Sequence, residues 1–253
     1  MKKILLLLAV VIAFTSCKKD SNTNPNTVTK KLTKIVSVYN GGSPETETYS
    51  YDAQGRFTQI VSDDDTEFFV YNSGTSFTVT RRKNSDNSFL LTMECTQDAN
   101  GRVTKILYKN AGGTVTNSYE YTYNAEGYVT QEKYDNFGAS PWGYIREFFL
   151  TNGNVTSYKK YDNGILVSTG EYTYDLNKTN KHQWNYSANW PSTALFGKGS
   201  KNLTTVVQVK NTSNTVTWQS AITWQLDADG YPVSATMNYP LSGNQGTDTY
   251  TYQ

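Results

Sequence analysis

The sequence predicts an all-β protein, a large antiparallel meander of about fifteen strands that is curved or rolled toward a barrel and carries one irregular loop. One observation is a recurring unit of alternating aromatic residues, an Asp/Asn-x-x-Gly turn and a β-branched strand. Copies of this unit stand at residues 49–58, 98–104, 121–130 and 224–233. The second observation is that Thr, Val and Tyr alternate with period 2 along most of the chain after residue 30, which is typical of strands.

Fifteen strands are expected in chain order. They cover residues 31–39, 45–52, 57–62, 67–71, 76–82, 89–96, 103–109, 119–123, 143–150, 155–161, 165–174, 203–210, 216–226, 233–239 and 247–252. Period-2 alternation places Tyr49 and Tyr51 on one face of the second strand. In the strand at 119–123, three tyrosines share one face while Glu120 and Thr122 share the other. We expect one continuous domain over residues 30–253.

The turns between these strands follow from their residue types. An Asp or Asn at the first turn position accepts a hydrogen bond from the backbone two residues on. The glycine at the fourth position adopts the left-handed conformation that closes a type I turn with a bulge. The structural turn glycines are therefore Gly55, Gly101, Gly127 and Gly230, and Gly153 is a shortened version.

Residues 176–202 break the rhythm of alternation. A short helical turn is expected over residues 193–196, capped by Ser192 or Asn189 and ended by Gly197 or Gly199. Long insertions of this kind in a meander are functional loops or plugs that cover an open end.

The first residues carry an export signal. Lys2 and Lys3 precede an apolar stretch of about eleven residues, which is too short to span a bilayer. The segment 1–16 ends in small residues before Cys17, and this arrangement resembles a bacterial lipobox, in which the cysteine is acylated. The alternative is an ordinary cleaved signal. Residues 17–29 are polar and predict a flexible tether.

A lipobox cysteine usually receives several acyl chains, which hold a protein stably on a membrane. We therefore expect an exported chain that touches the membrane only through the lipid on Cys17. Lys18 after the cysteine resembles the sorting pattern of outer-membrane lipoproteins. The periplasmic face and the cell surface both stay open.

Composition narrows the function classes. The chain has 20 Tyr, 10 Phe and 5 Trp, enough aromatic surface to bury a core. Without Lys2 and Lys3, 21 basic residues stand against 22 acidic residues, a net charge of −1. This balance gives no electrostatic footprint for nucleic acid.

The repeats carry a family resemblance. Tyr49-Ser50-Tyr51-Asp52 with Gly55-Arg56 resembles the YD repeat of Rhs-type bacterial surface proteins. The chain from 30 to 253 resembles lipoproteins of Bacteroidetes-type bacteria with a domain of unknown function and a porin-like fold, through Trp190 to Leu203 and Asp229 to Pro232. This resemblance implies a porin-like fold that is soluble, and it brings no catalytic residues.

Chemistry-bearing residues are few. The single histidine, His182, stands in a polar loop and is expected at the surface. Cys95 sits on an alternating strand and is expected to be a buried free thiol. Residues 63–65 with Glu67 offer oxygen ligands for a hard cation, although a solvated hairpin tip is the simpler interpretation. We expect no catalytic residue, no metal site and no cofactor.

The five tryptophans are Trp142, Trp184, Trp190, Trp218 and Trp224, and together they could form a sugar-stacking platform. Trp218 and Trp224 lie at even spacing on one strand, so core packing is expected for them. Trp184 and Trp190 stand in the irregular loop and are the candidate ligand-facing residues, with plug packing as the alternative.

The sequence favours a non-enzymatic envelope lipoprotein with a binding or scaffolding role. Its partner is a glycan or an envelope protein, and nucleic acid is not expected. The alternatives are a carbohydrate-binding surface lipoprotein of a glycan-uptake system and, less favoured, a hydrolase with a carboxylate pair. A transmembrane barrel is disfavoured because Lys105, Lys159 and Lys210 lie inside expected strands and the mean hydropathy is −0.60.

Overall fold

The computed structural model describes residues 30–72, 74–138, 141–182, 190 and 193–253. The signal segment 1–16, Cys17, the tether 17–29 and Trp184 lie outside the described residues. Residues Lys31–Gln253 form one compact unit.

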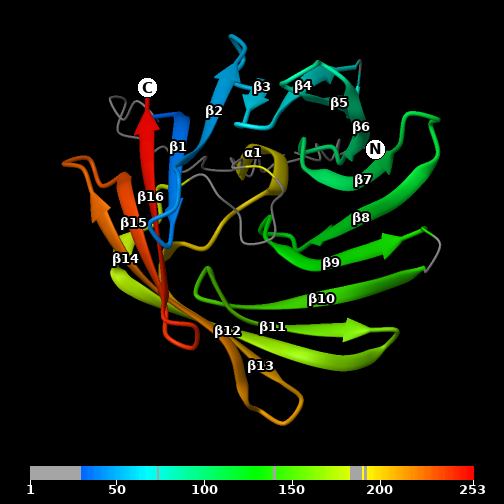
Figure 1. Ribbon diagram of the computed structural model, residues 1–253. Coiled ribbons are helices and arrows are strands. Elements are labelled where there is room, and N and C mark those ends of the chain that lie inside the picture. The colour runs from blue at the N-terminus through cyan, green and yellow to red at the C-terminus, as the bar shows by residue number, and fades with distance from the viewer. Residues whose placement is uncertain (1–29, 73, 139–140, 183–189, 191–192) are drawn as a thin grey trace, which may run out of the picture. The chain divides into compact units, whose positions relative to one another are not determined.

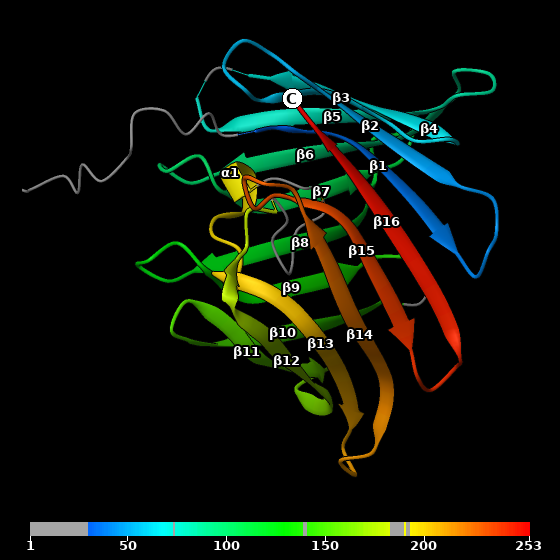
Figure 2. The same ribbon diagram turned by 90° about the vertical axis from the view of Figure 1, so that its left-hand side faces the viewer.

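In these residues, sixteen antiparallel strands follow one another around a closed barrel (Figures 1 and 2). They are β1 (Leu32–Tyr39), β2 (Glu45–Tyr51), β3 (Phe57–Val61), β4 (Asp65–Tyr71), β5 (Ser76–Lys83), β6 (Phe89–Gln97), β7 (Val103–Lys109), β8 (Val115–Tyr123), β9 (Val129–Asn136), β10 (Trp142–Thr151), β11 (Asn154–Asp162), β12 (Ile165–Thr179), β13 (Asn202–Asn211), β14 (Val216–Leu226), β15 (Pro232–Tyr239) and β16 (Asn244–Tyr252). The expected all-β meander is confirmed. The first and last strands pair with each other, Ile35 opposite Tyr250, so the sheet closes.

One strand was absent from the sequence prediction. The strand β9 reads VTQEKYDN and pairs with β8 and β10 along its length. Its inward positions hold Val129, Glu132 and Tyr134, so a buried carboxylate interrupts the apolar face. Alternation of apolar and polar residues therefore fails as a signal for this strand.

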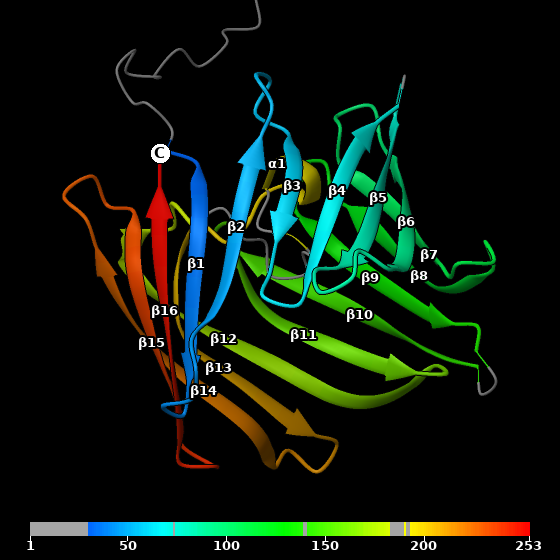
Figure 3. The same ribbon diagram turned by 45° about the horizontal axis from the view of Figure 1, so that its top comes forward.

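The two ends of the barrel differ in their connections (Figure 3). Because neighbouring strands run antiparallel, the turns at 52–55, 98–101, 124–127 and 227–230 all lie at one end, called here the turn end. The loops 40–44, 84–88, 110–114, 212–215 and 240–243 lie at the other end, called here the mouth. The chain enters β1 at the turn end, where the backbone N–H of Lys31 donates to the carbonyl oxygen of Gln253 at 2.9 Å.

The turns have the expected construction. At the first copy, Oδ1 of Asp52 accepts hydrogen bonds from the backbone N–H groups of Gln54 at 3.0 Å and Arg56 at 2.9 Å. Gly55 closes the turn with φ of 80°. A bulge follows the turn: Tyr51 pairs with Phe57 but Ser50 pairs with Gln59, so the strand after the turn carries one extra residue.

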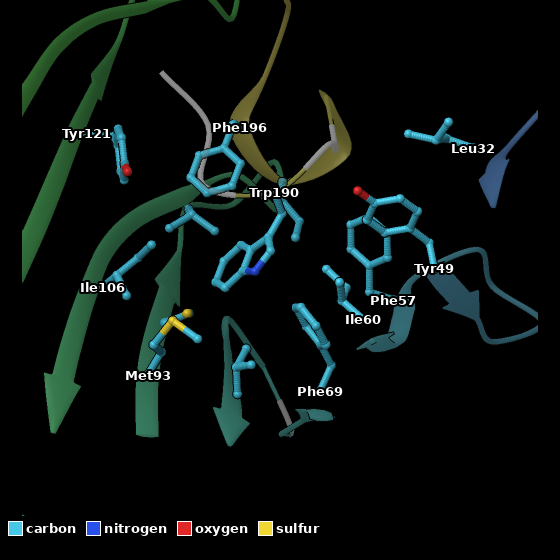
Figure 4. Packing of buried hydrophobic residues seen from close by; sticks show 14 of the residues in the cluster. Leu32, Tyr49, Phe57, Ile60, Phe69, Met93, Ile106, Tyr121, Trp190 and Phe196 are labelled. Carbon is cyan, nitrogen blue, oxygen red and sulfur yellow. The ribbon is translucent and has the colours of Figure 1, made fainter. Parts of the chain in front are cut away.

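Aromatic side chains fill the turn end of the barrel, together with the segment between β12 and β13. This plug segment (described residues 180–182, 190 and 193–201) contains α1 (Thr193–Phe196), the helical turn that the sequence predicted. Figure 4 shows Trp190 and Phe196 between side chains of the barrel wall. The predicted caps Asn189 and Ser192 lie outside the described residues. The irregular stretch begins later than expected, since β12 continues to Thr179.

The two faces of the wall differ in character. Buried apolar residues such as Phe77, Val79 and Ile106 face inward and form one cluster. Ion pairs lie on the outer face, including Lys105–Glu120 at 2.7 Å and Lys210–Glu171 at 2.7 Å. Exposed pairs of this kind typically contribute little to stability.

Candidate functional site

The inner wall at the mouth carries a group of four aromatic rings from β8, β9 and β10. The ring of Tyr134 lies at its centre, with ring centroids 4.9 Å from Tyr119, 5.0 Å from Trp142 and 5.3 Å from Tyr144. Tyr134 and Tyr144 are stacked, with 25° between their planes. We call these four residues the mouth platform. Trp142 is 49% exposed, so one ring of the platform is open to solvent.

These rings are brought together by strand register. Tyr144 stands directly opposite Tyr134, and Tyr134 directly opposite Tyr119. Directly opposite residues in an antiparallel pair have neighbouring side chains on the same face. Trp142 and Tyr144 are two residues apart and share that face as well.

A buried ion pair lies next to the platform. Glu132 is 4% exposed, and its Oε1 lies 3.3 Å from Nη1 of Arg146. The same oxygen accepts a hydrogen bond from the Tyr144 hydroxyl at 3.0 Å. Burial raises the pKa of the Glu132 carboxyl, and the Arg146 charge and the Tyr144 hydrogen bond counteract that rise. Nε of Arg146 is buried and makes no hydrogen bond.

Further cations lie over the neighbouring rings. The Arg146 guanidinium is 5.0 Å from the ring centroid of Tyr144 and 5.7 Å from that of Tyr158. Nζ of Lys160 lies 4.7 Å from the Tyr144 centroid and 3.5 Å from Oδ1 of Asp162. Each cation therefore has a carboxylate partner. The wall at this point combines aromatic faces with donors and acceptors and has little excess charge.

Gly170 makes room for one of these rings. It stands opposite Tyr158, and a Cβ at this position would lie 2.0 Å from Cε1 of the Tyr158 ring. The ring therefore lies flat against bare backbone on the next strand. This arrangement keeps Tyr158 close to the wall instead of projecting into the barrel.

A second aromatic cluster lies at the mouth on β1, β14 and β15. Trp218 is 42% exposed, and its ring centroid lies 5.9 Å from Tyr239, which is 5.8 Å from Tyr39. The Tyr239 hydroxyl lies 3.7 Å from Sδ of Met237. This cluster resembles the mouth platform in exposure but has a thioether where the platform has an ion pair. Core packing was expected for Trp218, and its exposure shows that this prediction was wrong.

The candidate ligand-facing residue Trp190 lies in the plug. It is 3% exposed, and its ring packs edge-on against Phe69 at 5.3 Å and near Phe196 at 5.9 Å. Its Nε1–H donates to Oε2 of Glu67 at 2.6 Å. Burial raises the pKa of Glu67, and the hydrogen bond from Trp190 lowers it. This is the plug packing that the sequence offered as the alternative. Trp184 lies outside the described residues.

The acidic group near the 62–65 loop does not form one cluster. Asp65 is buried and pairs with Nη2 of Arg81 at 2.5 Å, whereas Oδ2 of Asp63 accepts from the backbone N–H of Thr46 at 3.0 Å. The prediction of a solvated hairpin tip is therefore wrong for Asp65 and Glu67. Both residues belong to β4, and their side chains point into the barrel. Among the described residues, no group of three or more His, Cys, Asp or Glu side chains could hold a metal ion.

His182 is partly buried against aromatic rings of the wall, whereas an exposed surface position was expected. Its ring centroid lies 4.7 Å from that of Tyr250 and 5.9 Å from that of Trp224, and Nδ1 lies 3.5 Å from the Tyr252 hydroxyl. Burial lowers the pKa of His182 to about 4. The polar sequence around it misled the prediction, because the plug turns inward at this point. Cys95 is a buried free thiol, as expected.

The four turn glycines Gly55, Gly101, Gly127 and Gly230 all have positive φ, between 78° and 93°. A tyrosine or tryptophan near the turn end of a strand repeatedly donates a hydrogen bond to a backbone carbonyl on the neighbouring strand. The pairs are Tyr51 to Leu32 at 2.6 Å, Tyr123 to Val103 at 2.6 Å, Tyr174 to Val155 at 2.5 Å, and Trp224 to Thr204 at 2.7 Å. These residues are structural, and the sequence analysis did not identify this recurring bond.

The sequence analysis also missed most of the mouth platform. It named Trp142 among five tryptophans but assigned no role to Tyr134, Tyr144 or Arg146. The available signal was the spacing of Trp142, Tyr144 and Arg146 at every second residue on one strand. The partners on β9 could not be found, because that strand was not predicted.

Two hollows border the described wall. One of about 300 Å³ lies at the turn end, lined by residues that include Arg56, Tyr71 and Leu195. The other, of about 180 Å³, is a groove on the outward face of the wall near the mouth, lined by residues that include Lys133, Gly143 and Asn163. In the described part of the chain, no helix is long and apolar enough to cross a membrane.

Solved structures share this fold. A porin-like protein from Bacteroides uniformis aligns with a TM-score of 0.64 at 15% identity, over 88% of this chain and 98% of its own. A porin-like protein from Bacteroides vulgatus aligns with a TM-score of 0.63 at 15% identity, over 88% of this chain and 98% of its own. No family profile and no curated protein matches the chain. The porin-like fold that the sequence resemblance implied is thereby confirmed.

Proposed function

We propose that this chain is a non-enzymatic binding protein of the cell envelope, exported, anchored through lipid on Cys17 and sorted to the outer membrane, with a ligand site at the barrel mouth. The observation that carries the binding role is the pair of half-exposed tryptophans, Trp142 and Trp218, on the inner wall of the mouth. Ligand sites are concave and lined by aromatic residues with a few placed polar groups. The mouth has this composition.

The position of the plug supports entry of a ligand from the mouth. At the turn end, the backbone N–H of Lys198 donates to the carbonyl oxygen of Gly127 at 2.9 Å, and that of Lys201 donates to Gly153 at 2.8 Å. These bonds fasten the plug segment to two of the turns. A ligand would therefore reach the aromatic interior from the opposite end.

Two observations support the lipid anchor: the sequence of the first 17 residues and the ion pairs on the outer face of the barrel. Ion pairs such as Lys105–Glu120 lie where a membrane-embedded barrel carries an apolar band.

A binding role is favoured over hydrolysis by how the buried carboxylates are used. Glu132 is engaged by Arg146 and Tyr144, and Glu67 by Trp190. A glycoside hydrolase needs two carboxyl groups facing each other across the bond to be cleaved. The carboxylates at these two positions instead hold neighbouring side chains.

The anchor is tested with Cys17→Ala in the full chain. Wild type is expected to incorporate labelled palmitate and to sediment with outer membranes, whereas the variant loses the label and becomes soluble in the periplasm. Surface proteolysis of intact cells then separates the periplasmic face from the cell surface. A wild-type protein without acyl label contradicts the anchor.

The mouth is tested with Ser168→Trp, which places a large ring on the inward face of β12, and with Thr169→Trp as the matched control on the outward face. Both variants are titrated by calorimetry against soluble ligands of several classes: oligosaccharides, peptides, fatty acids and polyamines. Any ligand that binds wild type is expected to lose affinity for Ser168→Trp and to keep it for Thr169→Trp. Equal binding by both variants would place the site elsewhere.

A further inference from the structure

We propose that the mouth platform is a binding subsite for one pyranose ring of a neutral oligosaccharide, with Trp142 as the stacking face. This inference rests on the proposed binding role of the mouth and names the class of ligand. Its structural basis is the juxtaposition of an exposed ring with two ion pairs, Arg146–Glu132 and Lys160–Asp162. The second aromatic cluster around Trp218 lacks that set.

Trp142 is the ring of the platform that a ligand can cover. One face of Tyr144 is stacked on Tyr134, and the cations of Arg146 and Lys160 lie over the Tyr144 ring at 5.0 and 4.7 Å. The ring centroids of Trp142 and Tyr134 lie 5.0 Å apart, with 53° between the ring planes, and Trp142 is half exposed. Since about half of its surface is exposed, Trp142 has ring surface available for stacking.

The stacking face is held in place before any ligand arrives. Trp142 touches both Tyr134 and Tyr144, and Tyr134 is braced in turn by Tyr119. A ring held by neighbours loses little conformational freedom on binding, so less free energy is spent on ordering it. Aromatic faces carry partial negative charge and attract the C–H groups on one side of a pyranose ring.

The polar groups beside the platform suit hydroxyl groups. The Arg146 guanidinium and the Lys160 ammonium are partly exposed and offer N–H donors, and the partly exposed Asp162 offers a carboxylate acceptor. A sugar hydroxyl both donates and accepts, so it can bind to either kind of group. A purely apolar ligand would make no use of them.

The charge balance favours a neutral sugar over an acidic one. Arg146 is paired with Glu132, and Lys160 with Asp162, so neither cation adds uncompensated positive charge. The wall across the barrel adds acids at Glu47 and Asp248, each accepting a hydrogen bond from a tyrosine. The carboxylates of Glu47 and Asp248 would repel an anionic sugar, and like charges repel more strongly where little water is present.

The test uses calorimetry on the chain without its signal segment, with four neutral oligosaccharide series as probes: cello-, malto-, xylo- and manno-oligosaccharides. Oligogalacturonate serves as the acidic counterpart and mannitol as a polyol without a ring. At least one neutral series is expected to bind, and oligogalacturonate and mannitol to bind at least about tenfold more weakly. Stronger binding of the acidic series would overturn the inference.

Three substitutions locate the subsite. Trp142→Ala is expected to weaken binding by about tenfold or more, because a stacking aromatic ring is the kind of residue that dominates binding. Trp142→Tyr, which keeps an aromatic face, restores most of the affinity. Phe149→Ala, at a ring of similar exposure on the outward face of the same strand, changes affinity by less than about twofold. Equal losses for Trp142→Ala and Phe149→Ala would overturn the assignment to the mouth platform.

Failure of this inference differs from failure of the proposed function. If no sugar binds but a peptide, fatty acid or polyamine does, and Ser168→Trp blocks it, the mouth is a binding site and the sugar subsite is wrong. If no ligand of any class is affected by Ser168→Trp, both proposals are overturned. A circular dichroism spectrum matching wild type confirms that each variant is folded.

Discussion

The turn end and the mouth are built from the same kind of residue, yet they use it differently. At the turn end the rings are enclosed: Phe77 is 1% exposed and packs near Phe69 and Trp190. At the mouth the rings of Trp142 and Trp218 are half exposed. The plug contributes to the difference, because its described residues Trp190 and Phe196 supply apolar partners at the turn end. An aromatic ladder along a strand therefore stabilises the barrel where the plug covers it and offers a binding surface where it does not.

The largest expected effect is a difference in how much the aromatic rings at the two ends contribute to the free energy of unfolding. Phe77→Ala removes an enclosed ring and is expected to lower the free energy of unfolding by about 3–5 kcal/mol. Trp142→Ala, at the half-exposed mouth, is expected to cost less than about 1 kcal/mol. Urea denaturation followed by far-UV circular dichroism measures both. A loss at Trp142 as large as that at Phe77 would show that the mouth rings are structural as well.

The next effect concerns how the plug is attached. Gly197 has φ of 70°, and a Cβ there would lie 2.3 Å from the carbonyl oxygen of Gly127. Gly197→Ala is expected to destabilise the protein by about 2–4 kcal/mol, through steric overlap and the left-handed backbone. Gly113→Ala at the mouth is the control, since φ is 77° and nothing lies within 4 Å, and it should cost only about 1–2 kcal/mol. Thermal denaturation of the two variants compares them, and equal losses would argue against close packing of the plug.

A third effect appears on acidification. Burial lowers the pKa of His182 to about 4, below its ordinary value near 6.5, so the unfolded chain binds the proton more readily than the folded chain. The free energy of unfolding is therefore unaffected by His182 above pH 6.5. As the pH falls from 6.5 to 4, protonation of His182 in the unfolded chain lowers it by up to about 3 kcal/mol. Glu67 and Glu132 have raised pKa values and act in the opposite direction. The measurement is therefore a difference in unfolding free energy between wild type and His182→Phe at each pH.

His182→Phe keeps a ring against Tyr250 and Trp224 but cannot be protonated. Its stability relative to wild type should rise as pH falls from 6.5 to 4 and should be constant above pH 7. A difference that does not change with pH would mean that solvent reaches His182, and that the plug is looser than the described contacts indicate.

The strand ladder could be predicted because its signal is local. Alternation of Thr, Val and Tyr and the Asp/Asn-x-x-Gly turns depend only on neighbouring residues, and the helical turn at 193–196 was found from its flanking residues. The strand β9 was missed because Glu132 stands where an apolar residue was expected. Its burial depends on Arg146, which is 14 residues away and on another strand.

The candidate site was harder to predict than the fold for the same reason. His182 and Trp190 were judged from the polar residues around them, but their surroundings are set by strands far away in the sequence. His182 lies against Tyr250, and Trp190 donates to Glu67. The choice between the plugged and the open end likewise depends on where residues 180–201 fold, which no local pattern encodes.

The smallest expected effect tests the recurring hydroxyl bond at the turn end. The Tyr123 hydroxyl donates to the carbonyl oxygen of Val103 at 2.6 Å, and the Arg102 guanidinium lies 4.4 Å from the centroid of the same ring. Tyr123→Phe keeps the ring and the cation contact but removes the donor, at an expected cost of about 1 kcal/mol. Tyr39→Phe at the mouth is the control: its hydroxyl accepts from Nδ2 of Asn244 at 2.6 Å in an exposed place, where water replaces the partner. Urea denaturation should show a loss for Tyr123→Phe and almost none for Tyr39→Phe; equal values would mean that the bond between strands adds nothing beyond ring packing.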